Sequence, residues 1–124
     1  MAHVIQPEPI HCGGILETKK IAAMAKAYYV QTAPHCQFFH ISLATAVQVD
    51  ACTPNFLIQE GGRLRGKWLV KEPFKVEKGY IDPPTKPGLG VEVDLHAIEE
   101  HPYKPRPSGS PYITNHEDGS IEEL

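Results

Sequence analysis

The first 60 residues contain three short apolar runs that each end in an ionisable residue: VIQPE (4–8), VQTAPH (30–35) and FLIQE (56–60). Two segments long enough to form helices separate these runs. This alternation of strands and helices predicts a parallel sheet. Because the carboxyl ends of parallel strands lie at one edge of a sheet, we expect Glu8, His35 and Glu60 to converge on one site.

The two intervening segments carry helical periodicity. Residues 15–28 have apolar side chains at the i, i+3, i+4 and i+7 positions of one helical face: Ile21, Met24, Ala25 and Tyr28. A second helix is predicted over residues 41–51, and Thr53-Pro54, which follows, prevents it from continuing. The continuous apolar run at 56–58 predicts a strand that is buried on both faces.

The chain changes character after Glu72. Eight of its twelve prolines follow this residue, which predicts extended segments and turns rather than a second packed core. Residues 93–100 are the exception, because they are predicted to form a helix with Asp94 as its N-cap. The last 24 residues, rich in proline, are expected to form an extended arm.

Composition excludes several classes of partner. A net charge of −3 gives no basic field for nucleic acid, and no charged run indicates a membrane surface. No apolar stretch approaches the roughly 20 residues of a membrane span, and the N-terminus lacks the features of a signal peptide. We expect a soluble, cytoplasmic protein with no nucleic-acid or membrane partner. Its three cysteines, an odd number, are expected to be reduced thiols.

The sequence contains two possible cysteine-based sites, and both are disfavoured. The pairs His11-Cys12 and His35-Cys36 match no common zinc spacing, so a zinc site is disfavoured. Adjacent side chains on an extended segment point to opposite faces, which also disfavours Cys36 as a nucleophile activated by His35. For His11, Gln59 and Trp68, substrate contact and core packing are equally compatible with the sequence.

Several motifs occur in one order along the chain: QPEPIHCGGI (6–15), KIA (20–22), APH (33–35), PN with QE (54–60), KPGLGVEVD (86–94) and HEDGS (116–120). Together they resemble the enolase superfamily, in particular its mandelate-racemase-like subgroup and, within it, the sugar-acid dehydratases. The resemblance covers nearly the whole chain. Agreement of separate motifs in order is far more specific than any one of them.

The resemblance implies an α/β fold that is the C-terminal part of a TIM-type (β/α) barrel. Residues 1–66 would supply about three βα units, and residues 67–124 a C-terminal extension that packs on the capping domain. An eight-stranded barrel takes about 250 residues, so we expect a C-terminal fragment of a longer enzyme. The family's Mg²⁺ ligands would lie upstream of Met1. A homo-oligomer is expected for the full-length family.

The resemblance also implies roles for the three strand-end residues. His35 matches the histidine that moves a proton next to the substrate carboxylate, and Glu8 stands where the family usually has its aspartate partner. Glu60 matches a glutamate that binds the substrate carboxylate or stabilises the intermediate. The predicted reaction is magnesium-dependent dehydration of a sugar acid. A racemase or epimerase of the same subgroup, or a non-catalytic truncated fragment, is the alternative.

Overall fold

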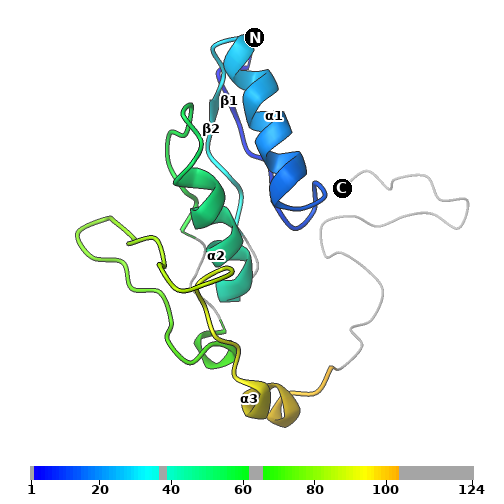
Figure 1. Ribbon diagram of the computed structural model, residues 1–124, viewed down its shortest axis with the longest axis vertical. Coiled ribbons are helices and arrows are strands. Elements are labelled where there is room, and N and C mark those ends of the chain that lie inside the picture. Colours follow the sequence, from blue (N-terminus) through cyan, green and yellow to red (C-terminus); the bar gives the residue numbers. More distant parts are fainter. Residues whose placement is uncertain (1, 37–38, 62–65, 104–124) are drawn as a thin grey trace, which may run out of the picture.

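The computed structural model describes residues 2–36, 39–61 and 66–103. Its elements, in chain order, are β1 (Val4–Ile5), α1 (Ile15–Ala27), β2 (Gln31–Thr32), α2 (Phe39–Asp50), the 3-10 helix η1 (Lys67–Leu69) and α3 (Leu95–Glu100). Figure 1 shows an elongated arrangement with α1 near one end and α3 at the other. Most of the arm predicted for the last 24 residues lies outside the described residues.

The strands form the predicted parallel sheet. β1 pairs in parallel with β2 in the register Val4 with Gln31 and Ile5 with Thr32. On the other side of β2, a parallel bridge joins Thr32 to Phe56. The order of the three segments therefore follows the chain, as expected for successive βα units, and the α/β prediction is confirmed.

The third apolar run differs from its prediction. It forms a single bridge at Phe56 instead of a strand, and Leu57 and Ile58 are 47% and 63% exposed. The prediction that this run is buried on both faces was therefore wrong for this chain. Among the described residues, β2 is the only strand that pairs with this run, so its other edge and much of its apolar surface stay open to solvent.

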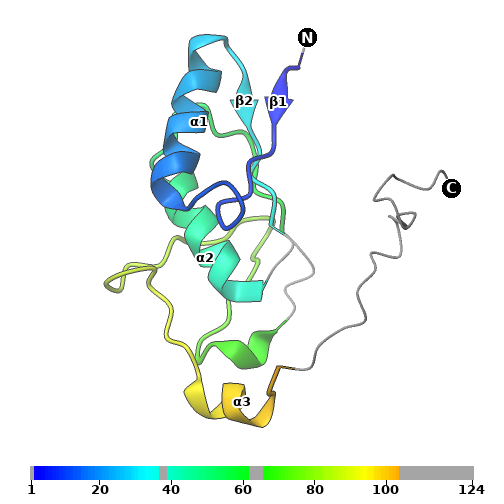
Figure 2. The same cartoon turned by 90° about the vertical axis from the view of Figure 1, so that its right-hand side faces the viewer.

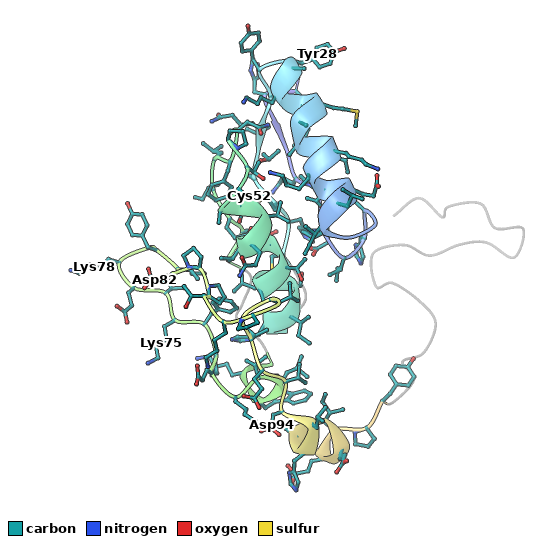
Figure 3. The ribbon with its side chains drawn as sticks, viewed as in Figure 1. Tyr28, Cys52, Lys75, Lys78, Asp82 and Asp94 are labelled. Atoms are coloured by element: carbon teal, nitrogen blue, oxygen red, sulfur yellow. The ribbon has the colours of Figure 1, made fainter. Side chains whose placement is uncertain are left out.

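Helix α1 forms where it was predicted, but its most buried positions lie beside the predicted face, of which Ile21 and Ala25 are only partly buried. Its buried residues are Thr18 and Ala22, whereas Met24 is 62% and Tyr28 is 79% exposed. Tyr28 lies at the far end of α1 in Figure 3. The small side chains of Thr18 and Ala22 allow the helix to approach closely, and apolar periodicity alone did not distinguish this stripe from the larger one beside it.

Helix α2 is buried on almost all sides. Its buried residues are His40, Ser42, Leu43, Ala44, Thr45, Ala46, Val47 and Val49. Leu43 and Val47 form the core cluster with Cys36, and Phe74 and Ile81 pack against that cluster from later in the chain. Figure 2 shows α1 and α2 on the same side of the two strands. The core therefore sits around α2, between the strands and the segment that follows.

We call residues 2–61 the strand–helix region and residues 66–103 the turn-rich region. The turn-rich region has few regular hydrogen bonds, with antiparallel bridges between Val70 and Val93 and between Glu77 and Tyr80. The helix predicted over 93–100 begins at Leu95, because Asp94 is its N-cap and accepts a hydrogen bond from the Ala97 N–H at 3.1 Å. The predicted cap is thus confirmed. That residues 67–124 pack on a capping domain stays a prediction.

Pro84 makes two close contacts, one with Gly90 inside the turn-rich region and one with Gln48 on α2. Gly90 has a φ of +75°, and a Cβ placed on it would lie 2.3 Å from the Cβ of Pro84. The carbonyl oxygen of Pro84 accepts a hydrogen bond from Gln48 Nε2 at 3.0 Å. Only glycine tolerates both the backbone conformation and this close approach.

Two further sequence-based expectations concern the described residues. The cysteines Cys12, Cys36 and Cys52 are all free thiols, as predicted. Within residues 2–36, 39–61 and 66–103, no helix is long and apolar enough to cross a bilayer.

Candidate functional site

Main-chain hydrogen bonds bring the three predicted site residues to the same end of the sheet. The ladder between β1 and β2 continues past both strands, because the His35 N–H donates to the Pro7 carbonyl at 3.1 Å. On the other side, the Glu60 N–H donates to the Pro34 carbonyl at 3.3 Å. The three chain segments thus run side by side up to their ionisable ends, and their side chains meet there.

Glu8 and His35 form a close pair. The Nδ1 atom of His35 lies 2.7 Å from Glu8 Oε2. Because a carboxylate only accepts, this contact places the imidazole proton on Nδ1 and leaves Nε2 as the basic nitrogen. The Glu8 residue is 6% exposed, whereas the His35 side chain is 34% exposed, so the pair is anchored on its glutamate side and open to solvent on its histidine side.

Glu60 lies on the open side of this pair. Its Oε2 accepts a hydrogen bond from the Cys36 main-chain N–H at 2.9 Å and lies 3.6 Å from His35 Nε2. The longer distance is not a hydrogen bond, and the two groups attract one another only when His35 is protonated. The Glu60 side chain is 42% exposed. It therefore sits beside the basic nitrogen with one oxygen fixed by the main chain.

A serine that the sequence did not point to completes the arrangement. Ser42, on the first turn of α2, donates its hydroxyl to Glu8 Oε1 at 2.7 Å and is 3% exposed. The Cys36 thiol is in turn 3.8 Å from the Ser42 oxygen. Burial raises the pKa of the Cys36 thiol, which keeps it protonated at neutral pH. The one signal in the sequence was a polar side chain in the apolar run Ile41 to Ala44.

The site residues do not form a metal cage by themselves. Within the part of the chain that the structure describes, no group of three or more His, Cys, Asp or Glu side chains could hold a metal ion. Both oxygens of Glu8 already accept hydrogen bonds, from His35 and from Ser42. A Mg²⁺ ion prefers about six oxygen ligands in octahedral geometry, which this donor set does not supply.

The other candidate residues from the sequence lie in varied surroundings. His11 is exposed, in the turn that follows Glu8. Gln59 donates from Nε2 to the Pro34 carbonyl at 3.0 Å, so it supports the strand end next to Glu60. Trp68 is in η1 and stacks on the His101 ring at a centroid distance of 4.2 Å. Packing or main-chain contacts account for Gln59 and Trp68.

A solvent-open hollow of about 870 Å³ lies elsewhere, in the turn-rich region. Charged side chains of both signs line it, among them Lys75, Lys78 and Asp82, which Figure 3 labels. None of the three strand-end residues lines this hollow. Its mixed charge selects no ligand, and the hydrogen-bonded cluster around His35 is the better candidate for chemistry.

Comparison with known protein families identifies the family of this chain. A family model described as enolase C-terminal domain-like matches residues 1–97. The chain belongs to this family. The resemblance noted in the sequence is thereby confirmed, and so is the α/β fold. The enolase C-terminal domain-like match includes the whole strand–helix region and therefore Glu8, His35 and Glu60.

Individual relatives and solved structures agree with the family. The chain is 40% identical to the D-galactonate dehydratase of Variovorax paradoxus (strain S110) over 97% of its own length and 34% of that protein. A mandelate racemase/muconate lactonizing enzyme from Jannaschia sp. CCS1 superposes with a TM-score of 0.78 at 33% identity, covering 85% of this chain and 28% of that one. A like-named enzyme from Sulfitobacter sp. gives a TM-score of 0.75 at 40% identity, covering 84% and 26%.

The chain thus spans about a third of the length of the curated relatives that it matches, for example 34% of the Variovorax protein. The roles of Glu8, His35 and Glu60, and the activity of any longer protein, are accordingly matters for proposal.

Proposed function

We propose that this chain supplies the proton-transfer residues of a sugar-acid dehydratase, acting together with the further sequence that its longer relatives contain. The observation that carries the proposal is the contact of 2.7 Å between Glu8 Oε2 and His35 Nδ1, with Glu60 Oε2 3.6 Å from the opposite ring nitrogen. The 40% identity to a D-galactonate dehydratase supports an aldonic acid as the substrate class. Loss of water from such an acid would give a 2-keto-3-deoxy acid.

In this proposal His35 acts through Nε2 as the general base or acid. The carbon next to a carboxylate is a weak acid, so its proton must be taken by a base with a fixed tautomer and orientation. Glu8 supplies both, because it holds the Nδ1 proton and faces the positive charge that forms on the imidazole during proton transfer. The partial exposure of His35 leaves Nε2 accessible to a substrate.

Glu60 would act on the same face as the transferred proton. In this proposal His35 removes the α-proton to give an enediolate, and the protonated His35 can return that proton to the β-hydroxyl, which leaves as water. A carboxyl group that donates a hydrogen bond to the substrate carboxylate would stabilise the enediolate. The Cys36 N–H fixes Glu60 Oε2, which leaves the other oxygen, Oε1, for this contact.

Magnesium enters this proposal only through the rest of the longer protein. Members of the superfamily typically use Mg²⁺, which stabilises negative charge on an enediolate. Since the described residues do not form a suitable cage, we assign no ligand to this chain and route no step through the metal. Isothermal titration of Mg²⁺ into the 124-residue chain should give no saturable binding, and a stoichiometric isotherm would contradict this assignment.

The test joins this chain to the preceding two-thirds of the Variovorax D-galactonate dehydratase and assays the product on a panel of aldonic acids. We expect formation of a 2-keto-3-deoxy acid. Substituting His35→Asn should lower kcat by roughly 10²-fold to 10⁴-fold, since it removes the general base or acid. A matched control is His96→Asn, because His96 is an exposed histidine on α3.

Two outcomes would contradict the proposal. Full activity of the His35→Asn protein would show that His35 takes no part in the reaction. Absence of dehydration for every aldonic acid, in a joined protein that is folded and monodisperse, would reject the reaction itself.

A racemase or epimerase is the second candidate, because the solved structures from Jannaschia and Sulfitobacter carry mandelate racemase/muconate lactonizing enzyme names. It shares the proton abstraction but returns the proton to the opposite face of the same carbon. Proton NMR in D₂O separates the two reactions. Deuterium at the α-carbon with retention of the β-hydroxyl would indicate racemisation or epimerisation, whereas loss of the β-hydroxyl would indicate dehydration.

A further inference from the structure

The buried side of the Glu8–His35 pair is held by α2. Glu8 carries one more methylene than an aspartate, so its carboxylate can rotate about an additional bond. In the structure it does not hang free, because Oε1 accepts the Ser42 hydroxyl at 2.7 Å while Oε2 faces His35 Nδ1 at the same distance. Each oxygen of the carboxylate is thus assigned to a different partner.

We propose that Ser42 is the positioning residue of the Glu8–His35 pair: its hydroxyl orients the Glu8 carboxylate so that Oε2 holds the Nδ1–H tautomer of His35. The expected effect of Ser42 on catalysis rests on the function proposed above. Its expected effect on the His35 tautomer does not, because that effect concerns the protein without substrate. Ser42 acts through Glu8 and touches no substrate.

The surroundings of Ser42 make its hydroxyl direction specific. Ser42 is 3% exposed, so water does not compete for its proton. On its other side the Ser42 oxygen accepts a hydrogen bond from the Cys36 thiol at 3.8 Å. The hydroxyl proton of Ser42 therefore stays available for Glu8. The Cys36 thiol donates to the Ser42 hydroxyl and this hydroxyl donates to the Glu8 carboxylate, so these two hydrogen bonds strengthen one another, while the His35 imidazole donates to the other oxygen of the same carboxylate.

The helix supplies the rigidity that positioning requires. Ser42 lies on the first turn of α2, next to Leu43, which is 1% exposed and belongs to the core cluster. A hydroxyl on a buried helix moves less than one on a loop. Glu8, in contrast, precedes a turn in which the His11 and Cys12 N–H groups donate to its carbonyl, so its own main chain fixes the backbone but not the carboxylate.

The experiment measures the tautomer of His35 and then the rate. Long-range ¹H–¹⁵N NMR at pH 8.5, on the joined protein with ¹⁵N-labelled histidine, reports which ring nitrogen carries the proton. We expect the Nδ1–H form of His35 to predominate in the parent protein. The population of the Nε2–H form should rise in Ser42→Ala. Ser42→Thr should restore the parent signal because it keeps the hydroxyl. His35→Asn identifies the resonance.

Catalysis gives the second readout. In Ser42→Ala, kcat should fall roughly tenfold with KM little changed, because one hydrogen bond to a charged group is lost and substrate contacts are not. Thr45→Val is the matched control, since the Thr45 hydroxyl is also buried on α2 but donates to the Ile41 carbonyl at 2.9 Å. It should leave both the tautomer and kcat unchanged.

The outcomes separate this proposal from the function on which it rests. An unchanged His35 tautomer in a folded Ser42→Ala protein would overturn the positioning role. If no aldonic acid is dehydrated by the parent, the proposed function fails, yet the tautomer ratio of Ser42→Ala against Ser42→Thr still decides the role of Ser42. Equal effects of Ser42→Ala and Thr45→Val would show loss of packing only, and would also overturn it.

Discussion

The strand–helix region and the turn-rich region are held together in different ways. In the first, α2 is buried nearly all round, and main-chain ladders tie three segments into a parallel array. In the second, Val70 is the only buried hydrophobic residue among those described, and turns connect two short helices, η1 and α3. The candidate site lies wholly in the first region. A region that must fix several ionisable groups has a packed helix behind it, whereas the other region depends on contacts made to that helix.

The comparison predicts its largest effect at the centre of α2. Leu43→Ala should lower the free energy of unfolding by about 3 kcal/mol, because it removes a side chain that is 1% exposed from the core cluster. The control in the turn-rich region is Val76→Ala, at a residue that is 51% exposed, where a change within about 0.5 kcal/mol is expected. Urea denaturation followed by circular dichroism measures both, and equal losses would erase the distinction between the regions.

A second test concerns the carboxyl at the end of α2. Both oxygens of Asp50 are buried and make no hydrogen bond among the described residues, and burial raises the pKa of this carboxyl from 3.8 to about 7. Between these two pH values the folded state keeps a proton that the unfolded chain has released. Stability should therefore fall as pH rises from about 4 to about 7, and level off above that.

Asp50→Asn removes this titration. At pH 8 it should raise the free energy of unfolding by roughly 2 kcal/mol, which is about half of the value given by 1.4 kcal/mol per pKa unit and allows for solvent screening. Thermal melts at pH 4 and pH 8 would show the gain mainly at pH 8. Asp82→Asn is the control, because Asp82 is exposed in the turn-rich region (Figure 3). A pH-independent gain would contradict the assignment to the carboxylate.

The contact between the two regions gives a smaller effect. Phe74 is partly buried against the core cluster, and its ring stacks near His40 at a centroid distance of 6.1 Å. Phe74→Ala should cost about 1.5 kcal/mol, less than a fully buried phenylalanine. It should also speed tryptic cleavage after Lys75 and Lys78 by detaching the turn-rich region from α2. Tyr80→Ala, at a residue that is 77% exposed, is the aromatic control and should leave cleavage unchanged.

The smallest effect is expected at surface ion pairs of the turn-rich region. Lys86 Nζ lies 2.8 Å from Glu72 Oε2, with both side chains exposed. This contact lowers the pKa of Glu72, but exposed pairs add little to stability because water and salt screen them. Lys86→Ala should have the same melting temperature as Lys75→Ala within experimental error. A clear loss confined to Lys86→Ala would mean that the turn-rich region has a stability of its own.

Sequence patterns were sufficient for the helices α1, α2 and α3, for the first two strands and for the meeting of the three segment ends. Alternating runs predicted α1, α2 and a parallel sheet, and strand-end placement predicted that Glu8, His35 and Glu60 converge. Their distances now agree with that geometry, while their catalytic roles stay predictions. The N-cap at Asp94 was predictable because capping depends on local residues.

Features that depend on tertiary packing were not predictable. Two apolar stripes compete on α1, and only the contact with β2 and α2 selects the one with Thr18 and Ala22. Segments far away in the sequence decide whether a strand edge is covered. For this reason the exposure of Leu57 and Ile58 could not be predicted. Ser42 escaped notice because a single serine in a helix has no spacing that connects it to Glu8, 34 residues away.

The close approach of Gly90 to Pro84 has a consequence for sequence variation. Any side chain at position 90 would collide with the proline ring at 2.3 Å and would also require a left-handed backbone. The chain could relieve the collision only by moving Pro84, whose carbonyl is the acceptor for Gln48 on α2. A saturation library at position 90 should therefore return glycine alone among stably folded clones, whereas position 88, where a Cβ would meet no neighbour within 4 Å, should also admit asparagine. Mutational tolerance along this loop is thus graded by the space around each position and not by glycine content.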